Sequence, residues 1–206
     1  MRSLVVTALV AVAATPLMAQ DLERPADWKV RFDRPTASDS TLYFVDMPPG
    51  WHITTGPAAI FYDPQRVGSG EYRVSSETYL FPGERREAFG VFVGGQDLET
   101  ADQRYVYFLV RKDGRFLIKQ RHGSSTTELH AWTEHPSIVK HDGGTGTAKN
   151  VLGIAVGSDT VTFTVNGATV ARLPREDLPT DGVVGLRVNH ALNIHVTTLD
   201  VEPAGR

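Results

Sequence analysis

The stretch that decides the fold is Thr160–Val165 followed by Asn166-Gly167, which reads TVTFTVNG. Apolar and polar residues alternate strictly, so Val161, Phe163 and Val165 would share one face of an extended chain. A period of two is typical of a β-strand that is buried on one face, and Asn-Gly is a strong signal for a tight hairpin turn. We therefore predict an antiparallel hairpin at this point.

The same signals recur along most of the chain. Lys112-Asp113-Gly114-Arg115 places Asp-Gly between two apolar runs, which predicts a second hairpin. No window has a sustained helical period, and short strands separated by glycine and proline indicate an all-β sandwich or barrel. The predicted strands are Trp28–Phe32, Leu42–Val45, Ala59–Tyr62, Glu71–Val74, Glu87–Val93, Tyr105–Arg111, Phe116–Arg121, Val151–Val156, Thr160–Val165, Thr169–Leu173, Val183–Val188 and Ile194–Val201.

Composition excludes several classes of function. The chain has 206 residues, a formal net charge of −3 and no cysteine. Proteins that bind nucleic acid usually carry a strongly basic face, so we expect no nucleic-acid partner. Disulfide frameworks, thiol nucleophiles and cysteine-based metal centres are excluded. Hydrophobic residues at 41% and charged residues at 22% are typical of a folded globular chain.

The first residues predict export. Met1-Arg2-Ser3 is a short basic start, Leu4–Ala14 is an uncharged apolar run, and Ala19 is a small residue suited to cleavage. We therefore predict a signal peptide at residues 1–19 and one β-sandwich domain at residues 20–206. An apolar run of eleven residues is shorter than the roughly 20 that a spanning helix needs. The mature protein is expected to be periplasmic or extracellular, without a membrane span.

The order of the predicted strands resembles a known superfamily. Asn150–Leu173, followed by Gly182–Val188 (GVVGLRV), resembles the C-terminal half of concanavalin A-like jelly-roll domains, and Ser69–Leu80 with Ala88–Val93 resembles their earlier front-sheet strands. The resemblance covers most of residues 28–202. It implies an antiparallel, two-sheet jelly-roll sandwich with a concave front sheet that often binds sugars. The superfamily includes lectins, laminarinase-type glycoside hydrolases, laminin-G-like modules and 3-keto-disaccharide hydrolase domains.

The hydrolases of that superfamily prompt a search for paired carboxylates. Retaining glycosidases need two carboxylates about 5–5.5 Å apart, and the laminarinase-type enzymes carry them as Glu-x-Asp-x-Glu on one front strand. That pattern is absent from the sequence. Glu71 and Glu77 share strand parity but would lie about 20 Å apart. We therefore expect binding without catalysis, and a glycoside hydrolase-like reaction if the protein is an enzyme.

Histidine spacing gives little support for a metal site. His130 and His135 are five residues apart, as are His190 and His195, and an odd separation on one strand places side chains on opposite faces. A hairpin at Ala191-Leu192 would instead place the second pair on neighbouring strands. We expect no cofactor. The sequence leaves the metal question open, because a calcium site built from backbone carbonyls and an aspartate leaves no recognisable pattern.

A polar and aromatic set remains as the candidate binding site. Sugar rings present an apolar face, which aromatic side chains cover, and a rim of hydroxyls, which polar side chains satisfy. Tyr105, Tyr107 and Arg111 share strand parity and would form a row on the front sheet, unless the tyrosines are ordinary half-buried strand residues. The substrate-binding candidates are Arg73, Glu77, Tyr105, Tyr107, Arg111, His122, Trp132, Asn189 and His195, with Lys119 and Arg121 beside them.

Three hypotheses for the function follow. The first is an exported carbohydrate-binding protein that holds a polysaccharide or oligosaccharide on the concave front sheet. The second is a glycoside-processing enzyme of the same superfamily. The third is a structural or protein-interaction domain of the cell envelope. The sequence makes no prediction about the oligomeric state or about which sugar is bound.

Overall fold

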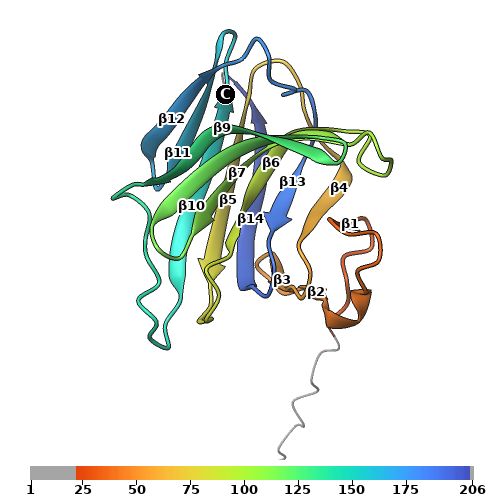
Figure 1. Cartoon of the computed structure of the whole chain (residues 1–206), viewed down its shortest axis with the longest axis vertical. Helices are drawn as coiled ribbons and strands as arrows, with labels where there is room; N and C mark the ends of the chain where they lie inside the picture. The colour runs from red at the N-terminus through yellow and green to blue at the C-terminus, as the bar shows by residue number, and fades with distance from the viewer. Residues whose placement is uncertain (1–21, 205–206) are drawn as a thin grey trace, which may run out of the picture.

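Two antiparallel sheets packed face to face make up residues 22–204, the part of the chain that the computed structural model describes (Figure 1). Sheet A has seven strands in the spatial order β1 (Lys29–Phe32), β4 (Ala59–Gly68), β13 (Gly182–Val188), β6 (Ala88–Gln96), β7 (Arg104–Arg111), β8 (Arg115–His122) and β9 (Ser125–Glu134). Sheet B has seven in the order β12 (Ala168–Pro174), β11 (Thr160–Val165), β10 (Ala148–Val156), β5 (Tyr72–Leu80), β14 (Asn193–Pro203), β3 (Trp51–Thr54) and β2 (Tyr43–Asp46).

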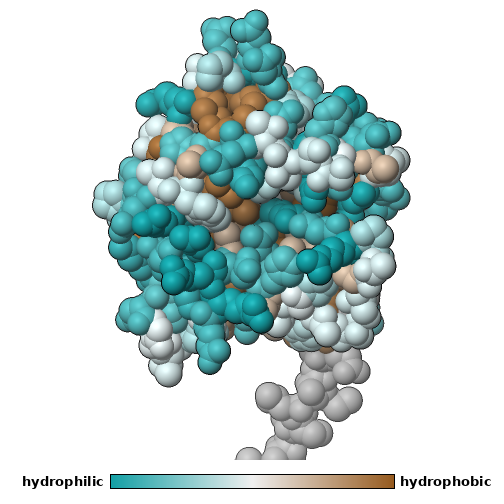
Figure 2. Space-filling model, viewed as in Figure 1, coloured by the Kyte–Doolittle hydropathy of each residue, from teal (hydrophilic) through white to brown (hydrophobic). Residues whose placement is uncertain are grey.

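The all-β, two-sheet fold predicted from the alternating pattern is confirmed. Within residues 22–204 the single helical element is a 3-10 turn at Asp39–Thr41, so no helix in that range could cross a membrane. The predicted signal peptide at residues 1–19 lies outside the described residues. Figure 2 shows hydrophilic residues over most of one face, with an apolar patch near the top.

The TVTFTVNG stretch folds as predicted. Val161, Phe163 and Val165 are fully buried between the sheets, and β11 pairs antiparallel with β12. The turn uses the left-handed region that this dipeptide tolerates, with φ of 51° at Asn166 and 81° at Gly167. The second predicted hairpin, between β7 and β8, is confirmed too. It turns at Gly114, which has φ of 82° and donates to the carbonyl of Arg111.

The expectation that Ser69–Leu80 and Ala88–Val93 both belong to the front sheet is wrong. The first segment becomes β5, a central strand of sheet B, and the second becomes β6, a central strand of sheet A. The two strands are consecutive in the sequence, but the chain crosses from one sheet to the other between them. Candidate site residues on β5 therefore lie on the opposite side of the sandwich from those on β7.

The central strands of sheet A, β6 and β7, are buried on both of their faces. The inner face of the sheet contributes Phe89, Val91 and Phe108 to the core between the sheets. Its outer face carries a second buried cluster, and consecutive residues of β6 and β7 are therefore buried instead of alternating. By contrast, β5 of sheet B alternates between buried and more exposed residues. The outer cluster consists of Ile60, Tyr62, Ala88, Phe92, Leu98, Tyr105, Tyr107 and Leu109.

Candidate functional site

The outer face of sheet A is concave, as a contact between distant strands shows. Asp33 directly follows β1, and its Oδ1 lies 3.6 Å from Nη2 of Arg121 on β8. Four strands separate β1 from β8 within the sheet. At a spacing of about 4.8 Å between neighbouring strands, a flat sheet would hold them too far apart for this contact. Figure 1 shows β7, β8 and β9 curving across the sandwich, as the contact requires.

A cavity of about 300 Å³ opens on this concave face. Its floor comes from the middle of β7, its sides from β8, β9 and β13, and its rim from the segment that precedes β6. We call it the sheet A cavity. The residues that line it are Arg86, Glu87, Ala88, Tyr107, Leu109, Arg111, Leu117, Lys119, Trp132, Arg187 and Asn189.

The guanidinium of Arg111 lies over the ring of Trp132 at one side of this cavity. Its central carbon is 4.4 Å from the centre of the indole ring, within the range of a cation–π contact. Its Nε and Nη2 donate to the two carboxylate oxygens of Asp113 at 2.8 and 2.7 Å. The hydrogen bond from Arg111 is the main reason that the pKa of Asp113 lies below its usual value. Arg111 is therefore held in one orientation, and its Nη1 takes part in neither of these two bonds.

Arg187 occupies the opposite side and is almost completely buried. Its guanidinium carbon lies 5.6 Å from the centre of the Tyr107 ring, and both of its Nη atoms donate to the carboxylate of Asp33. Burial raises the pKa of Asp33, but the hydrogen bond and charge of Arg187, with the charges of Arg121 and His190, outweigh it and lower that pKa overall. The ion pair thus remains charged at neutral pH.

Two buried polar atoms of the cavity lining have no hydrogen-bond partner. They are Nε of Arg187 and Oδ1 of Asn189. Buried polar groups in native proteins nearly always have a partner, either in the protein or in bound water. Atoms of the same kind occur away from the cavity on His52, Arg66, Arg104 and Asn193, so the two do not by themselves indicate a ligand.

The structure brings together four of the residues selected from the sequence. Tyr107, Arg111, Trp132 and Asn189 all line the sheet A cavity, as does Lys119. The expectation of an open aromatic row on this face needs correction, because Tyr105 is 1% exposed and Tyr107 is 6% exposed. Tyr105 lies on the predicted face but packs against other aromatic rings.

Other selected residues lie elsewhere, contrary to the expectation of one front-sheet set. Arg73 and Glu77 are on β5 and His195 is on β14, all in sheet B. Glu77 pairs with Lys149 at 2.6 Å, and this hydrogen bond is the main reason that its pKa is lowered. His195 Nε2 lies 2.9 Å from the carbonyl oxygen of Pro49. His122 is exposed at the end of β8 and does not line the cavity.

Sequence reasoning missed Asp33, Arg86, Glu87 and Arg187. A signal for Arg187 was present, because it is the one charged residue of the apolar strand GVVGLRV and has the parity opposite to the buried Val184, Leu186 and Val188. Its outward direction could have been inferred from that parity. Arg86 lies in an irregular segment, where no period indicates a direction. Glu87 is the first residue of the predicted strand Glu87–Val93, but β6 begins at Ala88, so strand parity does not apply to it.

The described residues contain no group of three or more histidine, aspartate or glutamate side chains arranged to hold a metal ion. His130 and His135 both contact the Phe116 ring, at 4.6 and 6.5 Å between ring centres. The predicted turn at Ala191 exists, with φ of 52°, but it connects β13 of sheet A to β14 of sheet B. His190 and His195 are therefore not on neighbouring strands.

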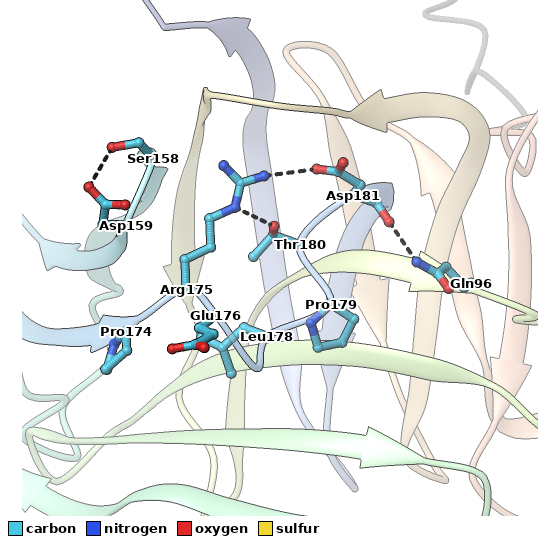
Figure 3. Close-up of a pocket in the computed structure, with 10 residues that line it drawn as sticks. All are labelled: Gln96, Ser158, Asp159, Pro174, Arg175, Glu176, Leu178, Pro179, Thr180 and Asp181. Atoms are coloured by element: carbon cyan, nitrogen blue, oxygen red, sulfur yellow. Dashed lines mark hydrogen bonds and ion pairs between the residues drawn. The ribbon is translucent and has the colours of Figure 1, made fainter.

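A larger cavity, of about 580 Å³, lies at one end of the sandwich (Figure 3). Arg175 crosses it and donates to the Gly157 carbonyl and to Oγ1 of Thr180, and it pairs with Asp181 at 3.2 Å. These bonds tie the segment between β12 and β13 to the turn between β10 and β11. Because its guanidinium is engaged in holding these loops together, we assign Arg175 a structural role.

No protein-family model matches the chain, and no curated protein matches it in sequence. Among solved structures, carbohydrate binding module CBM66 from Bacillus subtilis is 12% identical, with a TM-score of 0.63 over 85% of this chain and 95% of that one. A Bacillus subtilis protein of unknown function with a galectin-like fold is 12% identical, with a TM-score of 0.61 over 86% and 89%. A Bacteroides ovatus mixed linkage glucan GH16 protein, solved with a product, is 6% identical, with a TM-score of 0.56 over 88% and 97%. Likeness at these identities shows the fold alone, and it confirms the concanavalin A-like, jelly-roll sandwich expected from the order of the strands.

Proposed function

We propose that this protein is an exported, non-catalytic carbohydrate-binding protein that holds a glycan in the sheet A cavity. The observation that carries the proposal is the cavity itself, where Arg111, Lys119, Trp132, Arg187 and Asn189 converge on the concave face of the sheet. Arginine, lysine and asparagine supply the fixed hydrogen-bond donors that sugar hydroxyls and acidic groups need.

The structural neighbours support this assignment by analogy. CBM66 is named as a carbohydrate binding module, and a second neighbour is described as having a galectin-like fold. A shared fold does not transfer a function by itself. The analogy is supported by this chain's own concave sheet, which carries a cavity lined by arginine, lysine and asparagine side chains.

Binding is preferred over hydrolysis because of the carboxylates available. Glu87 is the single carboxylate among the residues that line the sheet A cavity. Glycosidases of the common type use two carboxylates on opposite sides of the scissile bond. Asp113 is close by, but both of its oxygens accept hydrogen bonds from Arg111. Export is proposed from the pattern of residues 1–19 alone.

The test measures retention of the pure protein on a broad panel of soluble and insoluble polysaccharides, with release of reducing sugar recorded in parallel. The wild type should be retained by at least one glycan. Arg111→Ala should weaken that binding about tenfold or more, the effect of losing a hydrogen bond to a charged group. Arg73→Ala is the matched control, because Arg73 is exposed on sheet B and should leave binding unchanged.

Two outcomes would overturn the proposal. If the wild type binds nothing across the panel, glycan binding fails and a structural or protein-interaction role replaces it. If reducing sugar is released, the non-catalytic part of the proposal fails, and Glu87 becomes the first carboxylate to substitute.

A further inference from the structure

The aromatic rings of the sheet A cavity are covered by arginines. Arg111 lies over Trp132 and Arg187 lies over Tyr107, at 4.4 and 5.6 Å from the ring centres. A sugar entering the cavity therefore meets guanidinium groups on these faces instead of bare rings. Building on the proposed glycan-binding function, we infer that the preferred ligand is an acidic glycan, one whose sugars carry a carboxylate or a sulfate.

Several donor atoms of the lining residues are not engaged in a hydrogen bond within the described part of the chain. Arg111 uses Nε and Nη2 on Asp113, which leaves Nη1 outside that bidentate pair. Nε of Arg187 has no partner. Nζ of Lys119 is 3.9 Å from the Glu128 carboxylate, beyond hydrogen-bond distance. Arg86 makes no ion pair with any residue that the structure describes and stands exposed at the rim.

Acceptors are scarce by comparison. Glu87, the hydroxyl oxygen of Tyr107 and Oδ1 of Asn189 are the side-chain acceptors among the lining residues. The carboxylates of Asp33 and Asp113 are bonded to Arg187 and Arg111, so they fix those arginines and do not contribute to the lining. A neutral sugar hydroxyl both donates and accepts, and is best satisfied by a balanced set of partners. A carboxylate or sulfate only accepts, which fits a cavity in which donors predominate.

The side chains that line the cavity carry more positive than negative charge. Four cationic side chains and one carboxylate line the cavity, in a protein whose formal net charge is −3. Asp33, Asp113 and Glu128 pair with three of these cations, and together with Glu87 they equal the four cations in number. Recognition must therefore come from short charge-assisted hydrogen bonds within the cavity, which arginine makes with defined geometry, and not from long-range attraction.

The experiment compares ligand pairs that differ only in the acidic group. One pair is polygalacturonate and its carboxyl-reduced product, and the other is dextran sulfate and dextran. Affinity is measured by titration calorimetry at low and at physiological salt. The acidic member of at least one pair should bind at least tenfold more tightly, and the pair that shows the difference identifies carboxylate or sulfate as the group. Salt should weaken the binding, since it screens charge.

Two surface variants test the location. Lys119→Gln and Arg86→Gln each remove one cation that is not part of a buried ion pair, and each should reduce affinity for the acidic glycan by several-fold. Arg73→Gln removes an exposed cation from sheet B and should have no effect. The inference is overturned if the neutral members bind as tightly as the acidic ones, a result that leaves the proposed glycan-binding function intact. It is also overturned if Arg73→Gln weakens binding as much as Lys119→Gln does, because attraction would then be nonspecific.

Discussion

Asp33 and Arg121 lie 3.6 Å apart although four strands separate β1 from β8 in sheet A. Arg187, from a strand between them, binds the same carboxylate through both of its Nη atoms. One aspartate therefore joins the two sides of the concave face above the buried Tyr105 and Tyr107. Asp33 thus connects two strands of the curved sheet through one carboxylate.

Asp33→Asn should destabilise the fold, because it leaves the guanidinium of Arg187 buried without a counter-charge. Removing one partner of a buried pair typically costs about 3–5 kcal/mol, and we expect a loss of about 3 kcal/mol in the free energy of unfolding in urea. Asp97→Asn is the control. It breaks an exposed pair with Arg104, whose two side chains are 42% and 46% exposed, and should cost at most about 1 kcal/mol. Equal effects of the two substitutions would contradict a special role for Asp33.

The contribution of Asp33 should also depend on pH. Its pKa is lower in the folded protein than in the unfolded chain, where an aspartate has a pKa of about 3.9. A carboxylate of this kind stabilises the fold fully above the unfolded pKa and loses that effect as the pH falls through the folded pKa. The difference in unfolding free energy between wild type and Asp33→Asn should therefore be constant from about pH 8 to 5 and shrink below about pH 4. Urea titrations at several pH values measure it, and a difference that grows on acidification would contradict the assignment.

Substituting Tyr107 should mainly lower the stability of the fold. Its side chain is buried in the outer cluster of sheet A, so Tyr107→Ala should cost about 3–5 kcal/mol, as for other large-to-small substitutions in a core. Tyr107→Phe retains the ring beneath Arg187 and should remain within about 1 kcal/mol of the wild type. Thermal unfolding of both variants measures the difference. If Tyr107→Ala proves as stable as the wild type, the ring is not packed as described.

Asn150 should be important for the loop that follows β9. It is 2% exposed, accepts from the backbone N–H of Val139 at 2.9 Å and donates to the carbonyl of the same residue at 3.1 Å. It also accepts from the amide of Asn166 at 3.0 Å. At roughly 1 kcal/mol for each bond, Asn150→Ala should lower the unfolding free energy by about 2–3 kcal/mol. The exposed Ser124→Ala should stay within about 0.5 kcal/mol in the same urea assay.

Strands were predicted best from the sequence where one face is buried and the other is exposed to solvent. In β11 the alternation of Thr160–Val165 follows directly from that arrangement. The edge strand β9 was missed because both of its faces are largely accessible and it has no apolar period, although Trp132 on it was selected. Local pattern also could not assign β5 and β6 to different sheets, because sheet membership is decided by pairing with β10, β14, β7 and β13 from distant parts of the chain.

Only the part of the candidate site that depends on local sequence was predicted. Strand parity correctly placed Tyr107 and Arg111 on one face, since parity is a local property. The burial of Tyr105 was not predictable, because it depends on the curvature of the sheet and on side chains that reach across it. Asp33 lies in an irregular segment after β1, and nothing in its local sequence indicates that Arg187, 154 residues later, is its partner.

The double burial of the central strands of sheet A has a consequence for how the protein moves. These strands are shielded by apolar clusters on both sides, whereas sheet B faces solvent on one side. Backbone amides in such a layer exchange with deuterium only when the whole domain opens, so those of β6 and β7 should be the slowest in the molecule. The floor of the cavity would then keep one shape for as long as the protein is folded. Adaptation to different ligands would fall to Arg86 and Glu87 at the rim and to the edge strand β9.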